Sequence, residues 1–197
     1  MKKGEIKYGF TIIEVVLVLA VAGLIFVMVF VALPALQRGQ RDNSRRDDMM
    51  NFISKVKKYQ TSNRGALPGE TITNINNKID VLPDENGAVS GASSTWAVFY
   101  HDYLGSNFID PNGVHYKLSV MLCNTSAIED KSCAGYSDWL SKLATTSFGT
   151  ATAPNDYRIM VVLQAKCKGT EAVGSSNPRN LAIVYRLEGS GAYCFNT

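Results

Sequence analysis

The sequence is poor in the residues and motifs on which most enzymes depend. It has only two histidines, His101 and His115, among its 197 residues. It contains no GxSxG nucleophile motif, no HExxH zinc motif and no phosphate-binding P-loop. These absences predict that the chain is not an enzyme and that it holds no metal or other cofactor. We expect both histidines to be surface or turn residues.

A large excess of charge of one sign is missing as well. Twenty lysines and arginines face seventeen aspartates and glutamates, which gives a formal net charge of +3. The first nine residues hold three lysines and one glutamate, a net of +2, so the remaining chain carries +1. Proteins that bind nucleic acid neutralise its phosphates with many basic side chains. A nearly neutral body therefore argues against nucleic acid as a partner.

Cysteine occurs only in the distal half of the chain, at Cys123, Cys133, Cys167 and Cys194. No CxxC pair is present and histidine is scarce, so these residues indicate two disulfides rather than a metal site. Disulfides require an oxidising space outside the cytoplasm, and buried free thiols are the alternative. Of three possible pairings we favour Cys123–Cys133, which closes a short loop, and Cys167–Cys194, which joins strand ends.

Residues 10–33 form an apolar run of 24 residues, in which Thr11 and Glu14 are the only clearly polar side chains. As a helix this run is about 36 Å long, enough to cross a bilayer core of about 30 Å. A secretory signal has an apolar core of only about 7–15 residues. The run therefore predicts a single membrane-spanning helix. Basic residues flank it on both sides, so the cysteines decide its orientation and place the large C-terminal part outside the cytoplasm.

Glu14 is the one acidic residue inside this run. A carboxylate at the centre of a spanning helix costs about 2.5–3.5 kcal/mol on insertion scales. One interpretation is that Glu14 lies close to the membrane interface and snorkels or is protonated. The other is that it has a cationic partner, and a cut after Gly9 would create one, the α-amino group of Phe10.

The residues around Glu14 resemble a known processing signal. Residues 7–14 read KYGFTIIE and are similar to the class III signal of type IV pilins and related pseudopilins. In that family a short basic leader ends in glycine, a phenylalanine follows, and a glutamate lies four residues beyond it. The matching residues here are Gly9, Phe10 and Glu14. Tyr8 departs from the pattern, because lysine or arginine is common at that position.

The resemblance implies that a membrane prepilin peptidase cuts after Gly9 and N-methylates Phe10. Residues 1–9 would then be a leader, and residues 10–35 would be the hydrophobic helix of the membrane and of the filament core. The chain would be a single-pass protein of the cell membrane until the inner-membrane assembly machinery adds it to a type IV pilus on the cell surface. There, copies of the chain would form a helical homopolymer, in which Glu14 pairs with the Phe10 amine of a neighbour.

Such a pilus would serve adhesion, twitching motility or DNA uptake. The nearest alternative is a pseudopilin of a type II secretion system or a minor pilin, which shares the N-terminal signal. An alternative of another class is a membrane-anchored extracytoplasmic binding domain, for which the apolar helix would be a permanent anchor.

Beyond the run, Pro34 and Gly39 predict a helix kink or local unwinding. Residues 36–64 are expected to continue as an amphipathic helix with Gly65 as its cap. The stripe that indicates this helix consists of Met49, Phe52, Ile53, Val56 and Tyr59, which recur at helical spacing. The charged residues 38–48 lack such a stripe. They are either a solvated helix face or a source of salt bridges between subunits.

Residues 65–197 are predicted to form one globular extracytoplasmic head. Strands are expected at residues 116–123, 157–165, 181–187 and 192–195, and a short helix at residues 96–104. A long N-terminal helix packed on a small antiparallel sheet is an α+β fold, and this is also the pilin plan. The sequences around Asp84 and Asp110 are expected to be turns rather than calcium sites. Trp96, Tyr100 and Trp139 are expected in the core.

Overall fold

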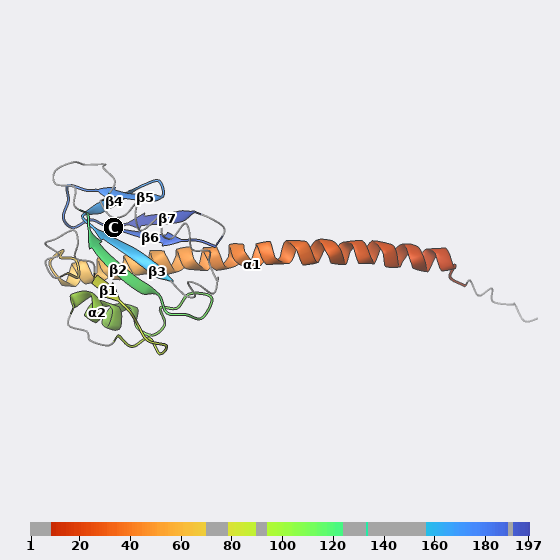
Figure 1. Cartoon of the computed structure of the whole chain (residues 1–197), viewed down its shortest axis with the longest axis horizontal. Helices are drawn as coiled ribbons and strands as arrows, with labels where there is room; N and C mark the ends of the chain where they lie inside the picture. The colour runs from red at the N-terminus through yellow and green to blue at the C-terminus, as the bar shows by residue number, and fades with distance from the viewer. Residues whose placement is uncertain (1–8, 70–78, 90–93, 124–132, 134–156, 189–190) are drawn as a thin grey trace, which may run out of the picture. The chain divides into compact units, whose positions relative to one another are not determined.

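The computed structural model describes residues 9–69, 79–89, 94–123, 133, 157–188 and 191–197. The chain divides into two units, the first ending at Gln40 and the second beginning at Arg41. Helix α1 (Ile12–Ser62) contributes to both, and the second unit also contains the remaining helices and all the described strands (Figure 1). Each unit is described by itself.

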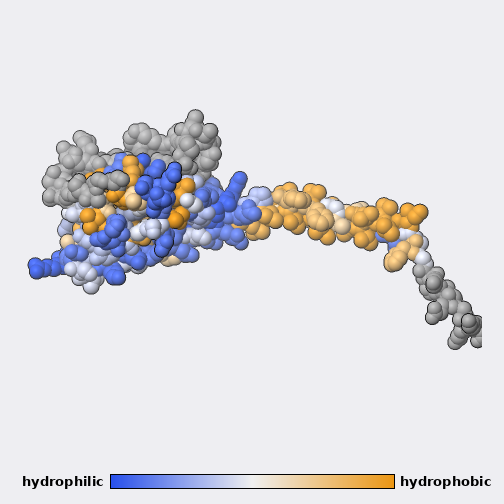
Figure 2. All heavy atoms as spheres, turned by 90° about the horizontal axis from the view of Figure 1, so that it is seen from below, coloured by the Kyte–Doolittle hydropathy of each residue, from blue (hydrophilic) through white to orange (hydrophobic). Residues whose placement is uncertain are grey.

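The first unit is a helix with an apolar surface. The large hydrophobic side chains from Phe10 to Leu36 are all exposed. Figure 2 shows this surface mostly in orange. Within the described residues, α1 is the helix long and apolar enough to cross a membrane. An exposed apolar surface of this extent indicates a contact with lipid or with another protein.

Pro34 and Gly39 both lie inside the continuous helix α1. The local unwinding expected at these residues is therefore wrong. A proline inside a helix removes one backbone hydrogen bond, and the strong helix formers on either side keep the neighbouring turns intact. A bend of the helix axis at this place stays a prediction.

In the second unit, α1 packs on the sheet through the stripe that helical spacing predicted. Met49, Phe52, Ile53 and Val56 are buried, and Tyr59 is partly buried against the same core. The side chains at this spacing share one face of the helix. The amphipathic helix is thus confirmed over its C-terminal part.

The end of α1 is closed by a left-handed turn. The amide of Gly65 donates to the carbonyl of Gln60 at 2.7 Å, as in a Schellman motif. Both Arg64 and Gly65 have positive φ angles, 56° and 83°. A cap of the predicted type is therefore present, but its left-handed position is taken by Arg64, one residue before the predicted Gly65, in a conformation that glycine usually adopts.

The described strands form one five-stranded sheet and one two-stranded sheet. The larger sheet has the order β1 (Ile79–Val81), β2 (Lys117–Leu122), β3 (Arg158–Leu163), β6 (Leu181–Arg186) and β7 (Ala192–Asn196). The smaller sheet is the hairpin of β4 (Ala165–Lys168) and β5 (Glu171–Gly174). The four predicted strands are present, whereas β1, β4 and β5 were not predicted.

One strand pair departs from the expected antiparallel sheet. Strands β2 and β3 are parallel, with Lys117 opposite Arg158 and Leu122 opposite Leu163. The other pairs are antiparallel, so the sheet is mixed. A parallel pair needs a connection of a dozen or more residues to return the chain to the same end of the sheet. Residues 123–157 are long enough to do so, and the α+β layout itself is confirmed.

The sheet has a buried face on each side. Alternate strand residues such as Val120, Ile159 and Ile183 belong to the core beneath α1, and their neighbours Met121, Met160 and Val184 to a second core. The first core also takes in α2 (Thr95–Phe99) and the π-helical turn η1 (Tyr100–Leu104). Side chains of a strand point alternately to its two faces. The nearly continuous apolar strands of the sequence thus follow from burial on both sides.

Two disulfides join the elements in the predicted pairing. Cys123 is bonded to Cys133, and Cys167 on β4 is bonded to Cys194 on β7. The second bond links the hairpin to the edge of the larger sheet. Trp96 and Tyr100 are fully buried, as expected, while Trp139 lies outside the described residues.

Candidate functional site

The predicted cleavage position lies in exposed backbone before α1. Gly9 and Phe10 precede the first helical residue, Ile12. The side chain of Phe10 is 88% exposed, and no atom lies within 4 Å of the place where a Cβ of Gly9 would be. Peptidases need an accessible, non-helical segment of chain. The geometry at the Gly9–Phe10 bond meets this requirement.

Glu14 has a partner on its own chain. Its Oε2 accepts hydrogen bonds from the amide of Thr11 at 3.2 Å and from the Thr11 hydroxyl at 3.0 Å. The carbonyl of Thr11 accepts the first hydrogen bond of the helix, from the amide of Glu14 at 3.1 Å. The bond to the Thr11 amide is one of the two bonds of a capping box, and through it an acidic side chain closes the N-terminal turn and faces its positive dipole end. The T-x-x-E spacing predicts such a cap, but both interpretations of Glu14 from the sequence overlooked it.

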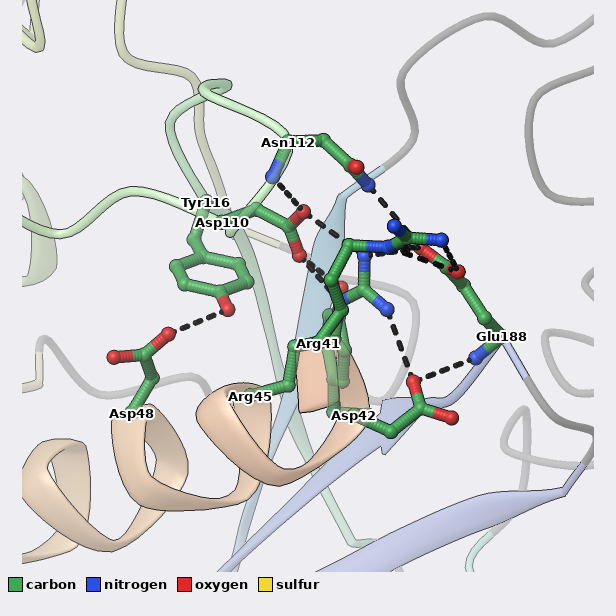
Figure 3. A network of polar contacts seen from close by, with 9 residues as sticks. Arg41, Asp42, Arg45, Asp48, Asp110, Asn112, Tyr116 and Glu188 are labelled. Carbon is green, nitrogen blue, oxygen red and sulfur yellow. Dashed lines mark hydrogen bonds and ion pairs between the residues drawn. The ribbon is translucent and has the colours of Figure 1, made fainter. Parts of the chain in front are cut away.

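A second group of polar residues lies where α1 meets the sheet (Figure 3). Its centre is Arg45, whose side chain is fully buried. The Arg45 guanidinium donates to both carboxylate oxygens of Asp110, at 2.6 Å and 3.0 Å. It also donates to Asp42 at 2.9 Å and to Glu188 at 2.8 Å. A planar guanidinium with several donors suits this fork-like arrangement, which a lysine could not reproduce.

Arg41 adds a second cation to this group, which we call the Arg45 cluster. Its Nη2 lies 2.7 Å from Oε2 of Glu188, and its Nε donates to both Glu188 oxygens. The amide of Glu188 donates in turn to Asp42 at 2.9 Å, and the side-chain amide of Asn112 donates to Glu188 at 3.3 Å. The cluster therefore joins α1, the turn after Ile109 and the end of β6.

Two tyrosines border the cluster. The hydroxyl of Tyr185 donates to Asp110 at 3.0 Å, and the hydroxyl of Tyr116 donates to Asp48 at 2.8 Å. Burial raises the pKa of both tyrosines and of Asp48. The aromatic rings thus exclude water from the polar groups, which strengthens the hydrogen bonds between them.

The charges in the cluster hold one another in their ionised forms. Hydrogen bonds from Arg41 and Arg45 hold the pKa of Glu188 at about 2, against an ordinary value of 4.5, although burial opposes this. Burial disfavours the charge of Arg45 too, but its hydrogen bonds to Asp110 and Glu188 outweigh burial and raise its pKa. The paired charges are stable only together, because either one alone would be a buried charge without a partner.

The Arg45 cluster corrects both interpretations of residues 38–48 for Arg41, Asp42 and Arg45, whose ion pairs are made within the chain. Other residues of the segment, such as Arg38 and Asp47, are exposed, as a solvated helix face predicts. The sequence offered one signal, since Asp42 and Arg45 lie three residues apart on a helix. Asp110 was expected only as a turn residue. It does form a turn, with Gly113 donating to its carbonyl, but its side chain is a buried ion-pair partner.

The two histidines differ in their surroundings. His101 is exposed, as expected, and its Nδ1 lies 2.8 Å from Asp102. His115 is buried, which corrects the expectation of a surface residue, although it does pair with Ile109 across a turn. Its ring occupies the space beside Gly87, where a Cβ would lie 2.6 Å from the ring. Among the described residues, no group of three or more histidine, cysteine, aspartate or glutamate side chains could hold a metal ion.

Comparisons of the chain with models of protein families, with curated proteins and with solved structures give no match. The resemblance to pilins therefore stays a prediction from residues 7–14. The Arg45 cluster is saturated by contacts within the chain, which makes it a structural element of the head. The N-terminal segment, with an accessible bond and an uncovered apolar helix, is the candidate functional site.

We predict that Arg45→Met lowers the free energy of unfolding by about 3–5 kcal/mol, because it leaves buried carboxylates without their cation. Arg45→Lys should be less stable than the wild type, since lysine keeps the charge but lacks the planar fork. Urea unfolding of the full chain in detergent, followed by tryptophan fluorescence, measures both. Lys58, which is exposed on the same helix, provides the control, because Lys58→Ala should change stability by at most about 0.5 kcal/mol. A similar stability of Arg45→Met and Lys58→Ala would contradict the role of the cluster.

The low pKa of Glu188 predicts a loss of stability in acid. The unfolded chain binds a proton at this residue near pH 4.5, whereas the folded chain does so only near pH 2. The free energy of unfolding should therefore fall as the pH is lowered through this window. Urea midpoints at several pH values test this, with Glu188→Gln as the comparison. The variant should be less stable near neutral pH and show a shallower pH dependence between these values. An unchanged pH dependence would exclude Glu188 as its source.

Proposed function

We propose that this chain is the precursor of a type IV pilin, cut after Gly9 and assembled through its apolar helix into a surface filament. The observation that carries the proposal is the position of the exposed apolar part of α1. It begins directly after an accessible Gly9–Phe10 bond, and it has Glu14 as its one acidic residue. A membrane covers this surface before assembly, and the helices of other copies cover it in the filament.

The second unit supports this proposal because it needs no contact with the apolar part of α1 to be complete. It has its own hydrophobic cores on both faces of the sheet and its own ion-pair cluster. Its two disulfides suit an oxidising location outside the cytoplasm. A head of this kind stays folded while the apolar helix moves from lipid into a filament.

Glu14 has two successive roles in this proposal. In the precursor its carboxylate closes the first turn of α1 through Thr11. Cleavage then creates an amine at Phe10, and in a filament the amine of one copy meets Glu14 of another. In the apolar core of a filament an unpaired charge is costly, so this pair fixes the register between copies.

The two roles of Glu14 are separable by substitution. Glutamine can still accept the hydrogen bonds of a capping box, whereas alanine cannot, and neither carries a charge. We predict that Glu14→Gln and Glu14→Ala are both cut after Gly9 but both give far fewer surface filaments than the wild type. Shearing filaments from cells and quantifying this chain in them measures the yield.

Three results would contradict parts of this proposal. Filament loss in Glu14→Ala but normal yield in Glu14→Gln would assign the effect to the cap alone. Normal yield in both variants would remove Glu14 from assembly. Absence of the wild-type chain from all surface filaments would refute the pilin function and favour a permanently anchored protein. Thr11→Ala is the matched control, because it removes the hydroxyl of the cap and leaves the charge of Glu14 in place.

A further inference from the structure

An open groove lies at the C-terminal end of α1 and is lined by basic side chains. The groove has a volume of about 630 Å³, and Lys57, Arg64 and Arg179 contribute its charges. All three residues are exposed. Within the described part of the chain their side-chain charges take part in no ion pair. We call this feature the basic groove.

The backbone around the basic groove is held in place. The side-chain amide of Gln60 donates to the carbonyl of Arg179 at 2.9 Å, which fixes the loop before β6 to α1. The guanidinium of Arg179 lies over Gly65, where a Cβ would come within 3.1 Å of it. Arg64 is held at a positive φ that costs about 1 kcal/mol or more for a residue with a Cβ. The basic groove therefore presents its charges on an ordered surface.

A compact acidic loop lies between β1 and α2. Asp84 and Glu85 are both exposed. Asp84 accepts hydrogen bonds from the amides of Asn86 and Ala88, at 2.9 Å and 2.8 Å, so it holds the turn. Glu85 takes part in no ion pair among the described residues. The loop therefore presents the carboxylate of Glu85 to a partner.

The acidic loop and the basic groove lie at separate places on the second unit. The loop packs on His115 through Gly87, and His115 pairs with Ile109, next to the Asp110 that binds Arg45. This series of contacts links the loop to the part of α1 that holds Arg45. The groove begins at Lys57, about 18 Å from Arg45 along the helix at about 1.5 Å per residue. The surface around the loop and the groove share no lining residue.

We propose that the basic groove receives the Glu85 loop of a second copy of this chain, which joins the heads head to tail. Two complementary patches at separate places on one molecule form a heterologous contact, which generates an open helical assembly unless it closes into a ring. A nearly neutral chain offers no strong overall repulsion to this association. This inference rests on the proposed filament and names a contact outside its apolar core.

Charge reversal tests the contact in the full chain. We predict that Lys57→Glu and Glu85→Lys each lower the yield of surface filaments about fivefold, the effect of turning an exposed ion pair into a repulsion. The double variant Lys57→Glu with Glu85→Lys should recover part of the yield, because it reinstates one opposite pair while Arg64 and Arg179 remain cationic. Filaments of either single variant should also dissociate at a lower salt concentration than filaments of the wild type.

Matched controls separate this contact from general effects of charge. Lys58 is exposed on the same helix but does not line the basic groove, so Lys58→Glu should leave the yield unchanged. Glu171 is an exposed acid on the β4–β5 hairpin, and Glu171→Lys should do the same. Processing of each variant is measured by its mature N-terminus, and folding by its urea midpoint.

The outcomes are distinguishable from failure of the proposed function. If the wild type forms filaments and both single variants match the controls, the contact is wrong and the filament proposal stands. If the single variants lose filaments and the double variant does not recover, the two residues are not partners and the contact is again refuted. If Lys57→Glu and Arg179→Glu instead lower binding of a nucleic acid duplex, while Glu85→Lys has no effect on filaments, the groove serves a polyanion. If the wild type forms no filaments, the proposed function itself fails.

Discussion

The exposed apolar surface of α1 between residues 10 and 36 is the constraint on which the rest of this protein depends. Burial of one large hydrophobic side chain is worth about 1.5–3 kcal/mol, and the described unit leaves every such side chain in this range exposed. Exposure of such an apolar helix to water is energetically unfavourable. Lipid can bury its surface, and so can other copies of the same helix. In the proposed function, contacts with lipid are replaced by contacts with other copies.

The second unit, which we call the head, must hold the remainder of α1 in one register on the sheet. Its apolar stripe from Met49 to Val56 packs in the core, but apolar contacts are not directional. The Arg45 cluster does not, because a shift would leave Asp110 or Glu188 buried without a cation. We therefore see this cluster as the feature that fixes the position of the helix, while the disulfide from Cys167 to Cys194 fixes the outer hairpin.

The sequence predicted those elements that are determined by the spacing and type of residues close together in the chain. The stripe on α1 follows from helical spacing, and β2, β3 and β6 follow from runs of apolar and β-branched residues. The Arg45 cluster was missed because two partners of Arg45, Asp110 and Glu188, lie 65 and 143 residues away along the chain. The parallel pairing of β2 and β3 likewise depends on where a long connection returns the chain. The Thr11–Glu14 cap was within reach, because its spacing alone identifies it.

Mass spectrometry of the N-terminus of this chain, isolated from sheared surface filaments, is the most direct measurement of the central claim. Cleavage after Gly9 leaves the apolar helix with a free amine four residues before Glu14, which the account requires for pairing in the filament core. We predict a mature chain that begins with N-methylated Phe10 and is a component of the filaments. A chain that keeps Met1 and remains in the membrane fraction would contradict the account.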